Sequence, residues 1–69
     1  MRLLSGKELC RILERKGWNL RRVSGSHYIY SKAESVVRIS IPVHGNRPLK
    51  KGLLMSFLKA AELSDEDIG

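Results

Sequence analysis

The chain has 69 residues, of which thirteen are lysine or arginine and seven are acidic, so its formal net charge at pH 7 is +6. A chain this short buries only about 60% of its unfolded surface, which limits it to one domain (residues 1–69) and excludes a deep, walled active site. Four of the seven acids lie in the last eight residues, and residues 1–61 carry thirteen basic against three acidic side chains. This charge attracts polyanions such as nucleic acids, but it does not distinguish RNA from other polyanions.

Cysteine content and the start of the chain indicate the compartment. Cys10 is the only cysteine, whereas a secreted domain of this size usually needs disulfides. The sequence turns polar at Ser5, too early for the apolar core of a signal peptide or for a membrane span. We therefore expect a cytoplasmic protein without a membrane anchor. The sequence also has no clustered cysteine, histidine and acidic residues, so we expect neither a metal nor another cofactor.

The first predicted element is an amphipathic helix over residues 6–16. Ser5 and Glu8 have the spacing of a capping box at its start. Gly17 suits the left-handed residue that ends a helix, and Trp18 can then fold back into the core. One face of this segment is apolar at helical spacing and consists of Leu9, Ile12 and Leu13.

Three strand-like segments follow, separated by turn residues at 24–26 and 33–35. They are rich in aromatic and β-branched residues and span 18–23, 27–30 and 36–43. Pro42 closes the last segment, whose apolar face is formed by Val37, Ile39, Ile41 and Val43.

A loop over residues 44–48 precedes a second predicted helix, from Leu49 to about Ala61. Gly52 weakens this helix by up to about 1 kcal/mol relative to alanine. Its predicted core face consists of Leu49, Leu53, Phe57 and Leu58, with Leu54 and Ala61 flanking it. Residues 64–67 either form one further turn or fray.

The predicted order is helix, three strands and helix (αβββα), which is an α+β arrangement. Strands joined by short turns favour an antiparallel sheet. Such a sheet can bury one face under two helices and leave the other face open. Domains that bind double-stranded RNA have this architecture, and we expect a fold similar to theirs.

The second strand leaves one question open. Tyr28 and Tyr30 lie on one side of it, and His27 and Ile29 lie on the other. If the tyrosine side is the open face of the sheet, each ring can stack on an unpaired base, with about 1–3 kcal/mol gained per base. If it is the helix-covered face, the tyrosines belong to the core. Both sides of the strand are partly apolar, so periodicity does not decide.

The segment Gly25-Ser26-His27 carries the clearest chemistry. A histidine that follows a glycine-containing turn lies at the rim of a sheet, where an imidazole can accept and donate protons. RNA cleavage needs little beyond this and an anchored phosphate. A base removes the ribose 2′-hydroxyl proton, the oxyanion attacks the adjacent phosphorus, and an acid protonates the leaving oxygen. By itself, however, one such histidine is more often structural than catalytic.

Five short motifs occur along the chain, and they are Ser5-Gly6-Lys7-Glu8-Leu9, Lys16-Gly17-Trp18, Gly25-Ser26-His27, Pro42-Val43-His44-Gly45-Asn46 and Leu49-Lys50-Lys51-Gly52. Their order and spacing resemble the HicA family, the toxins of HicA–HicB toxin–antitoxin pairs, over about residues 5–67. The resemblance implies a fold like that of double-stranded-RNA-binding domains and a metal-independent ribonuclease that cuts messenger RNA. It also implies that His27 is the catalytic residue and that a HicB-type antitoxin covers this site.

Two positions depart from the pattern of these relatives. Many of them have a second histidine directly after the first, where this chain has Tyr28, a residue that can still hydrogen-bond or stack. Ala61-Glu62-Leu63 stands where relatives often have Ala-Gly-Leu. We therefore expect the second helix to run slightly longer or to end with strain.

Other residues are assigned to the RNA-binding surface. Lys50 and Lys51 open the second helix, where free N–H groups and the helix dipole favour phosphate; the alternative is a solvated helix start. His44, in the loop before this helix, is either a second proton carrier or substrate contact, or a hydrogen-bonded loop residue. The remaining assigned residues flank the catalytic histidine in sequence and are Gly25, Ser26 and Tyr28.

Three functions agree with these observations. The first is a ribonuclease toxin that is monomeric when free and is neutralised by an antitoxin. The second is a non-catalytic RNA-binding module of the same fold, which explains the charge without any role for His27. The third is a protein-interaction subunit whose basic face meets an acidic protein and which does not bind RNA at moderate salt. The ordered motifs favour the first.

Overall fold

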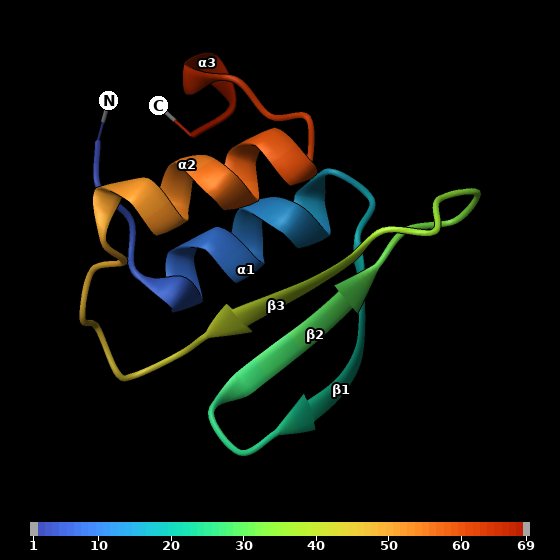
Figure 1. The fold of residues 1–69 in the computed structure, drawn as a ribbon, viewed down its shortest axis with the longest axis horizontal. Helices are drawn as coiled ribbons and strands as arrows, with labels where there is room; N and C mark the ends of the chain where they lie inside the picture. Colours follow the sequence, from blue (N-terminus) through green and yellow to red (C-terminus); the bar gives the residue numbers. More distant parts are fainter. Residues whose placement is uncertain (1, 69) are drawn as a thin grey trace.

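The computed structural model describes residues 2–68 and confirms the predicted order, and the segment after residue 64 forms the one further helical turn rather than fraying (Figure 1). The elements are α1 (Gly6–Arg15), β1 (Asn19–Ser24), β2 (His27–Ser31), β3 (Arg38–Pro42), α2 (Lys51–Ala60) and α3 (Asp65–Ile68). The three strands form one antiparallel sheet in the order β1-β2-β3. This α+β arrangement is consistent with the fold of double-stranded-RNA-binding domains. Within residues 2–68, no helix has the length and apolar character that crossing a membrane requires.

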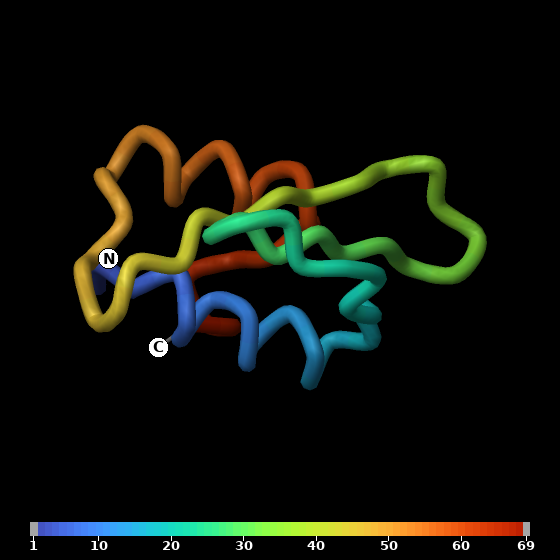
Figure 2. The backbone as a smooth tube through the Cα atoms, turned by 90° about the horizontal axis from the view of Figure 1, so that it is seen from below, coloured from blue at the N-terminus to red at the C-terminus, as the bar shows by residue number. Residues whose placement is uncertain are grey.

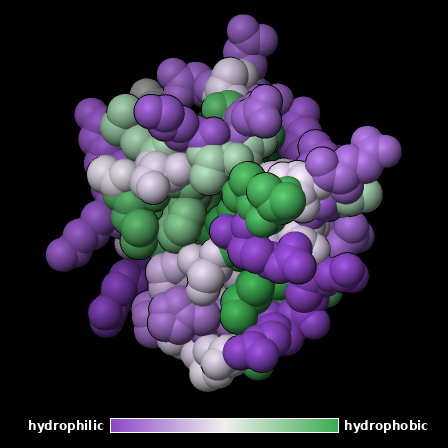
Figure 3. Space-filling model, turned by 45° about the vertical axis from the view of Figure 1, so that its right-hand side comes forward, coloured by the Kyte–Doolittle hydropathy of each residue, from purple (hydrophilic) through white to green (hydrophobic). Residues whose placement is uncertain are grey.

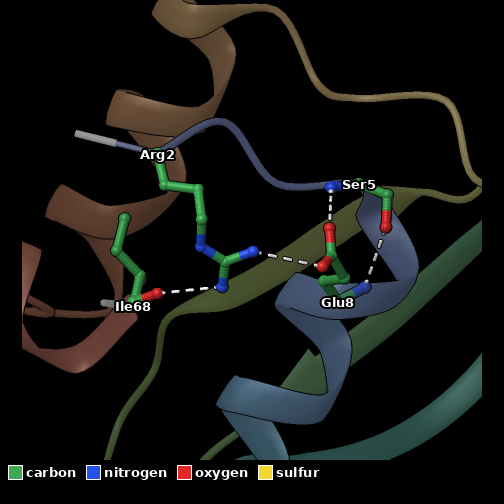
Figure 4. A network of polar contacts seen from close by, with 4 residues as sticks. All are labelled: Arg2, Ser5, Glu8 and Ile68. Carbon is green, nitrogen blue, oxygen red and sulfur yellow. Dashed lines mark hydrogen bonds and ion pairs between the residues drawn. The ribbon is translucent and has the colours of Figure 1, made fainter.

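Capping residues set both ends of α1. The Glu8 backbone N–H donates to Ser5 Oγ over 3.1 Å, and the Ser5 N–H donates to Glu8 Oε1 over 2.9 Å, which completes the predicted capping box (Figure 4). After the last turn, Gly17 adopts a left-handed φ of 94°. The Trp18 N–H then donates to the Leu13 carbonyl over 2.9 Å, a bond typical of helix ends with a left-handed glycine. Trp18 is thereby buried in the core, as predicted.

The tyrosines lie on the covered face of the sheet, which makes Tyr30 a core residue and leaves Tyr28 partly exposed at the margin. Across the β2–β3 ladder, Tyr28 is opposite Ile41 and Tyr30 is opposite Ile39. Tyr30 is 1% exposed, and its hydroxyl donates to Glu14 Oε2 of α1 over 2.6 Å. Burial and this hydrogen bond raise the pKa of Tyr30 well above its ordinary value. Tyr30 is therefore a core residue, and Tyr28, half-buried, packs at the margin of the same core.

One hydrophobic core joins both long helices to this face of the sheet. Its members come from α1, the sheet, α2 and the segments between them, and they include Leu9, Leu13, Ile39, Ile41, Leu54 and Leu58. On the other face, the exposed residues include Arg22, Ser24, His27 and Ser40, whereas Ile29 is half-buried and Ser31 is buried. In Figure 1 the helices lie on the β3 side of the sheet, and β1 forms the outer edge. The sheet thus has one covered and one open face, as predicted.

The start of β3 differs from the prediction. The strand begins at Arg38 rather than at residue 36, and Val36 and Val37 lie in the preceding loop, 96% and 38% exposed. Figure 2 shows this loop projecting from the rest of the fold. The Val37 N–H donates to Ser35 Oγ over 3.1 Å, so a local turn competes with strand pairing at this point. Figure 3 turns this side of the molecule forward and shows apolar residues at the surface among hydrophilic ones.

The core face of α2 also differs from the prediction. Leu54 and Leu58 are buried, whereas Leu53 is 42% exposed and Phe57 is half-buried. Because this helix carries apolar residues around much of its circumference, helical spacing allowed more than one buried face. Leu49, just before the helix, is buried, and its N–H donates to the Leu4 carbonyl over 2.7 Å.

The end of α2 follows the second of the two expectations. The helix ends at Ala60, and Glu62 adopts a left-handed φ of 57°. For a residue with a side chain, this conformation costs about 1–2 kcal/mol, whereas glycine adopts it without this cost. The Leu63 N–H donates back to the Leu58 carbonyl over 2.8 Å. The helix therefore ends with strain and does not run longer.

Asp67 attaches α3 to α1. Its Oδ1 lies 2.9 Å from Lys16 Nζ, and its Oδ2 accepts a hydrogen bond of 2.8 Å from the Ser64 backbone N–H. The hydrogen bond from Ser64 and the contact with Lys16 lower the pKa of Asp67 from 3.8 to about 2. A carboxylate with a lowered pKa stabilises the folded state above its unfolded pKa, and this contribution is lost as pH falls through the folded value.

We therefore expect Asp67→Asn to lower the melting temperature at pH 7 and to have a smaller effect as the pH falls from about 4 to about 2. Thermal unfolding followed by circular dichroism across this range measures the difference. Asp65→Asn is the matched control, because Asp65 is an exposed acid of the same helix with no ion pair to the part of the chain the structure describes. If the difference in melting temperature between wild type and Asp67→Asn did not change with pH, the lowered pKa of Asp67 would be contradicted.

Candidate active site

His27 stands at the rim of the open face. It is the first residue of β2, it is exposed, and it pairs with Ser24 of β1 on one side and Pro42 of β3 on the other. Gly25 makes the preceding turn with a left-handed φ of 60°, and a Cβ built there would meet no atom within 4 Å. Gly25 is therefore required for its backbone conformation and not for space.

The loop after β3 lies beside this turn. The Val43 N–H donates to the Ser26 carbonyl over 2.8 Å, which extends the contact between the two segments beyond the last strand pair. His44 follows directly and is exposed, and its carbonyl accepts a hydrogen bond of 3.2 Å from the Arg47 N–H. The two histidines of the chain thus lie in adjoining segments at one end of the sheet.

Both long helices begin at the same end. At the start of α1, a Cβ on Gly6 would overlap the Pro42 carbonyl oxygen, so the helix backbone rests directly on the end of β3. At the start of α2, Pro48 forms an isolated β-bridge with Ser5. We call this region the histidine end, and it comprises Gly25–His27, His44–Arg47 and the first residues of α1 and α2. In Figure 1 it runs from the start of α2 at the left down to the turn between β1 and β2 at the bottom.

The start of α2 is electrostatically unusual. Lys50 is the N-cap residue and makes no side-chain capping hydrogen bond, Lys51 follows, and the first turn contains no acid. The free N–H groups and the positive end of the helix dipole favour an anion there, whereas lysines at this position are unfavourable by about 0.3–1 kcal/mol. Both lysines are exposed. A phosphate would satisfy the N–H groups and offset the repulsion at once.

Further basic residues extend this charge over the histidine end, and the exposed ones are Lys7, Arg11 and Arg47. Glu8 stands between Lys7 and Arg11 in α1, and it is occupied by the capping box and by Arg2, whose Nη1 lies 3.2 Å from Glu8 Oε2 (Figure 4). The Ser5 N–H and then Arg2 lower the pKa of this carboxyl. Three of the other acids belong to α3, which Figure 1 places on the far side of the helices from β1 and β2.

The predicted site residues thus fall into two groups. Gly25, Ser26, His27, His44, Lys50 and Lys51 all lie at the histidine end. Tyr28 lies on the covered face, where it lines a pocket of about 410 Å³ together with Lys7, Cys10, Val43, Gly45 and Asn46. Lys7 and Asn46 stand in two of the sequence motifs but received no predicted role, because no spacing rule links residues this far apart in the chain. Catalytic and binding roles for all these residues stay predictions.

The part of the chain from residue 2 to residue 68 brings no three histidine, cysteine or acidic side chains together as a metal site would need. No curated protein matches the chain significantly in sequence. A family model, described as the HicA toxin of bacterial toxin–antitoxin systems, matches residues 6–63 and includes every segment of the histidine end. The chain therefore belongs to the HicA toxin family.

Proposed function

We propose that this toxin is an endoribonuclease that cleaves messenger RNA without a metal ion and uses His27 as its catalytic residue. The observation that carries the proposal is the position of His27. Its imidazole is exposed at the rim of the open face, at the end of the sheet where α2 begins with two lysines. Membership of a toxin family supports an activity directed at an essential cellular polymer.

The proposed reaction is a transesterification within the RNA chain. A base removes the 2′-hydroxyl proton, the 2′-oxygen forms a bond to the adjacent phosphorus, and the bond from phosphorus to the next 5′-oxygen breaks as an acid protonates that oxygen. His27 performs one of these proton transfers, and His44 in the adjoining loop is the candidate for the other. The products are a 2′,3′-cyclic phosphate and a 5′-hydroxyl.

RNA binding is assigned to the surface around His27. The start of α2, with Lys50 and Lys51, holds a phosphate, and the Gly25-Ser26 turn lies against the backbone next to the histidine. The lysines thus contribute to RNA affinity and take no part in the reaction, whereas His27 transfers a proton and contributes little to affinity. A HicB-type antitoxin is proposed to cover the histidine end, in the cytoplasm, and the free toxin is proposed to be a monomer.

Replacing Lys50 and Lys51 together by alanine should weaken binding to RNA of any sequence and make it less dependent on salt. Removing one phosphate contact to single-stranded RNA lowers the slope of log Kd against log salt concentration by about 0.7. Fluorescence anisotropy with a labelled oligonucleotide at several salt concentrations measures this slope. Lys59→Ala, an exposed lysine at the other end of α2, is the control. An unchanged slope in the double variant would place the phosphate elsewhere.

The proposed activity is tested by incubating the purified chain with mixed-sequence RNA in EDTA. We expect cleavage of this RNA and no cleavage of a fully 2′-O-methylated copy, which lacks the nucleophile but still binds. Binding to both RNAs without cleavage of either would instead support the RNA-binding module of the same fold. Absence of binding at moderate salt would support the protein-interaction subunit.

A further inference from the structure

A second feature of the histidine end has no role in the proposed reaction. The pocket of about 410 Å³ that Tyr28 lines opens between α1 and the loop after β3. Its walls combine one aromatic ring, two apolar side chains (Cys10 and Val43), one amide (Asn46) and one cation (Lys7). An aromatic surface next to an amide and a cation is the combination with which proteins hold an unpaired RNA base.

We propose that this pocket binds an unpaired base of the RNA substrate, adjacent to the phosphate at which His27 acts. The inference rests on the proposed RNA cleavage and specifies how that site selects its substrate. Tyr28 forms the wall on which the base stacks, Asn46 contacts the polar edge of the base, and Lys7 meets the attached phosphate.

The pocket and the histidine lie at the same end of the sheet. His27 and Tyr28 are neighbours in β2 and point to opposite faces of the sheet. The Val43 N–H, from a residue that lines the pocket, bonds to the carbonyl of Ser26, the residue before His27. An RNA strand that passes around this end of the sheet therefore places one base on the covered side while the neighbouring phosphate stays at the open side.

The walls of the pocket suit an uncharged aromatic ligand such as a base. Cys10 is 6% exposed, and burial raises the pKa of its thiol, so this wall remains neutral at physiological pH. Tyr28 is half-buried against the core and thus offers a ring whose position is already fixed. A fixed ring loses little conformational entropy when a base stacks on it.

A second hollow beside the pocket is lined by basic residues that suit a polyanion. This hollow, of about 290 Å³, shares Lys7 and Asn46 with the first and is also lined by Arg11 and by Glu8. The Glu8 carboxylate is already paired with Arg2 (Figure 4), so Lys7 and Arg11 determine the sign of this hollow. Charge complementarity therefore favours the sugar–phosphate backbone of RNA as the occupant of this second hollow, next to the base in the pocket.

The other large hollow, of about 380 Å³, does not share these properties. It is lined by Trp18, Lys16 and Lys32 among others, and Lys16 is already paired with Asp67. None of its lining residues belongs to the histidine end. A base bound there would not define the position of the phosphate at His27.

Binding to uncleavable RNA tests the pocket independently of catalysis. Four 2′-O-methyl hexanucleotides that differ in one central base are titrated against the full chain and followed by anisotropy. We expect the wild type to distinguish the four bases, and Asn46→Ala to lose that discrimination, on the order of 10-fold for the preferred base. Tyr28→Ala should weaken binding of all four roughly 5- to 100-fold, whereas Tyr28→Phe retains the stacking surface and most of the affinity.

Controls separate this proposal from folding and from the proposed function. Asn46 is exposed in a loop, so Asn46→Ala remains informative even if Tyr28→Ala does not fold, and Asn19→Ala is a matched exposed asparagine at the far end of β1. Discrimination that survives in Asn46→Ala, or a wild type that cleaves RNA but binds the four oligonucleotides equally, would overturn the base pocket and leave the ribonuclease in place. Discrimination by a wild type that does not cleave 2′-hydroxyl RNA would refute the ribonuclease and not the pocket.

Discussion

Replacing His27 by alanine should lower the rate constant of RNA cleavage by a factor of about 10² to 10⁴, the usual contribution of a positioned proton-transfer group. The variant should keep its fold, because His27 is exposed at the start of a strand whose hydrogen bonds are made by the backbone. RNA affinity should change little, because the phosphate contacts are assigned to the start of α2 and not to the histidine. Loss of rate without loss of binding is the expected signature.

Single-turnover cleavage of a 5′-labelled RNA in EDTA, with anisotropy and thermal unfolding on the same preparations, separates these quantities. His44→Ala is the matched variant, since His44 is also exposed and lies at the same end. A comparable loss in His44→Ala would identify the second proton carrier, and full activity would assign that transfer to another group. Undiminished cleavage by His27→Ala would refute the catalytic assignment, whatever His44 does.

Elements with signals in neighbouring residues were predictable from the sequence. The start and end of α1 follow from Ser5, Glu8 and Gly17, because each cap is a hydrogen bond or a backbone conformation within a few residues. The turn at Gly25 and the antiparallel order of the strands follow in the same way, since short connections leave few alternatives. The predicted fold class was therefore correct.

Predictions were wrong where distant contacts decide between two local patterns. Val37 continues the apolar alternation of β3, yet the strand begins only at Arg38, and Val36 and Val37 remain in the preceding loop. Leu53 fits the helical spacing of a core face as well as Leu54 does, and only Leu54 is buried. Such choices depend on how α2 is rotated against α1 and the sheet, which periodicity does not encode.

The histidine end shows the same division. The motif Gly25-Ser26-His27 was recognisable in the sequence, because three consecutive residues carry it. The contacts that assemble the surface around it, between Ser26 and Val43 and between Leu4 and Leu49, join segments more than fifteen residues apart. The pocket beside it draws on α1, β2 and the loop after β3. That Lys7 and Asn46 line one pocket could therefore be seen only in the folded chain.

Gly6→Ala should destabilise the protein by about 1–3 kcal/mol, the usual effect of forcing an extra group into a packed site. An ideal Cβ on Gly6 would overlap the Pro42 carbonyl oxygen and lie 3.0 Å from the carbonyl carbon. Both are backbone atoms at the end of β3, so no side-chain rotation can relieve the overlap, and α1 must move away from the sheet. For a domain of this size, each kcal/mol lowers the melting temperature by about 4–8 °C.

Gly52→Ala is the matched control, because Gly52 is also a helical glycine near a helix start, and a Cβ there would meet no atom within 4 Å. Alanine at this position should stabilise the protein by up to about 1 kcal/mol through helix propensity alone. The free energy of unfolding is measured with urea for both variants. A decrease for Gly6→Ala together with an increase for Gly52→Ala would show that the cost at Gly6 comes from the contact between α1 and β3. If Gly6→Ala were as stable as the wild type, α1 could not lie this close to β3. Lys7 would then lose the placement that brings it to the histidine end.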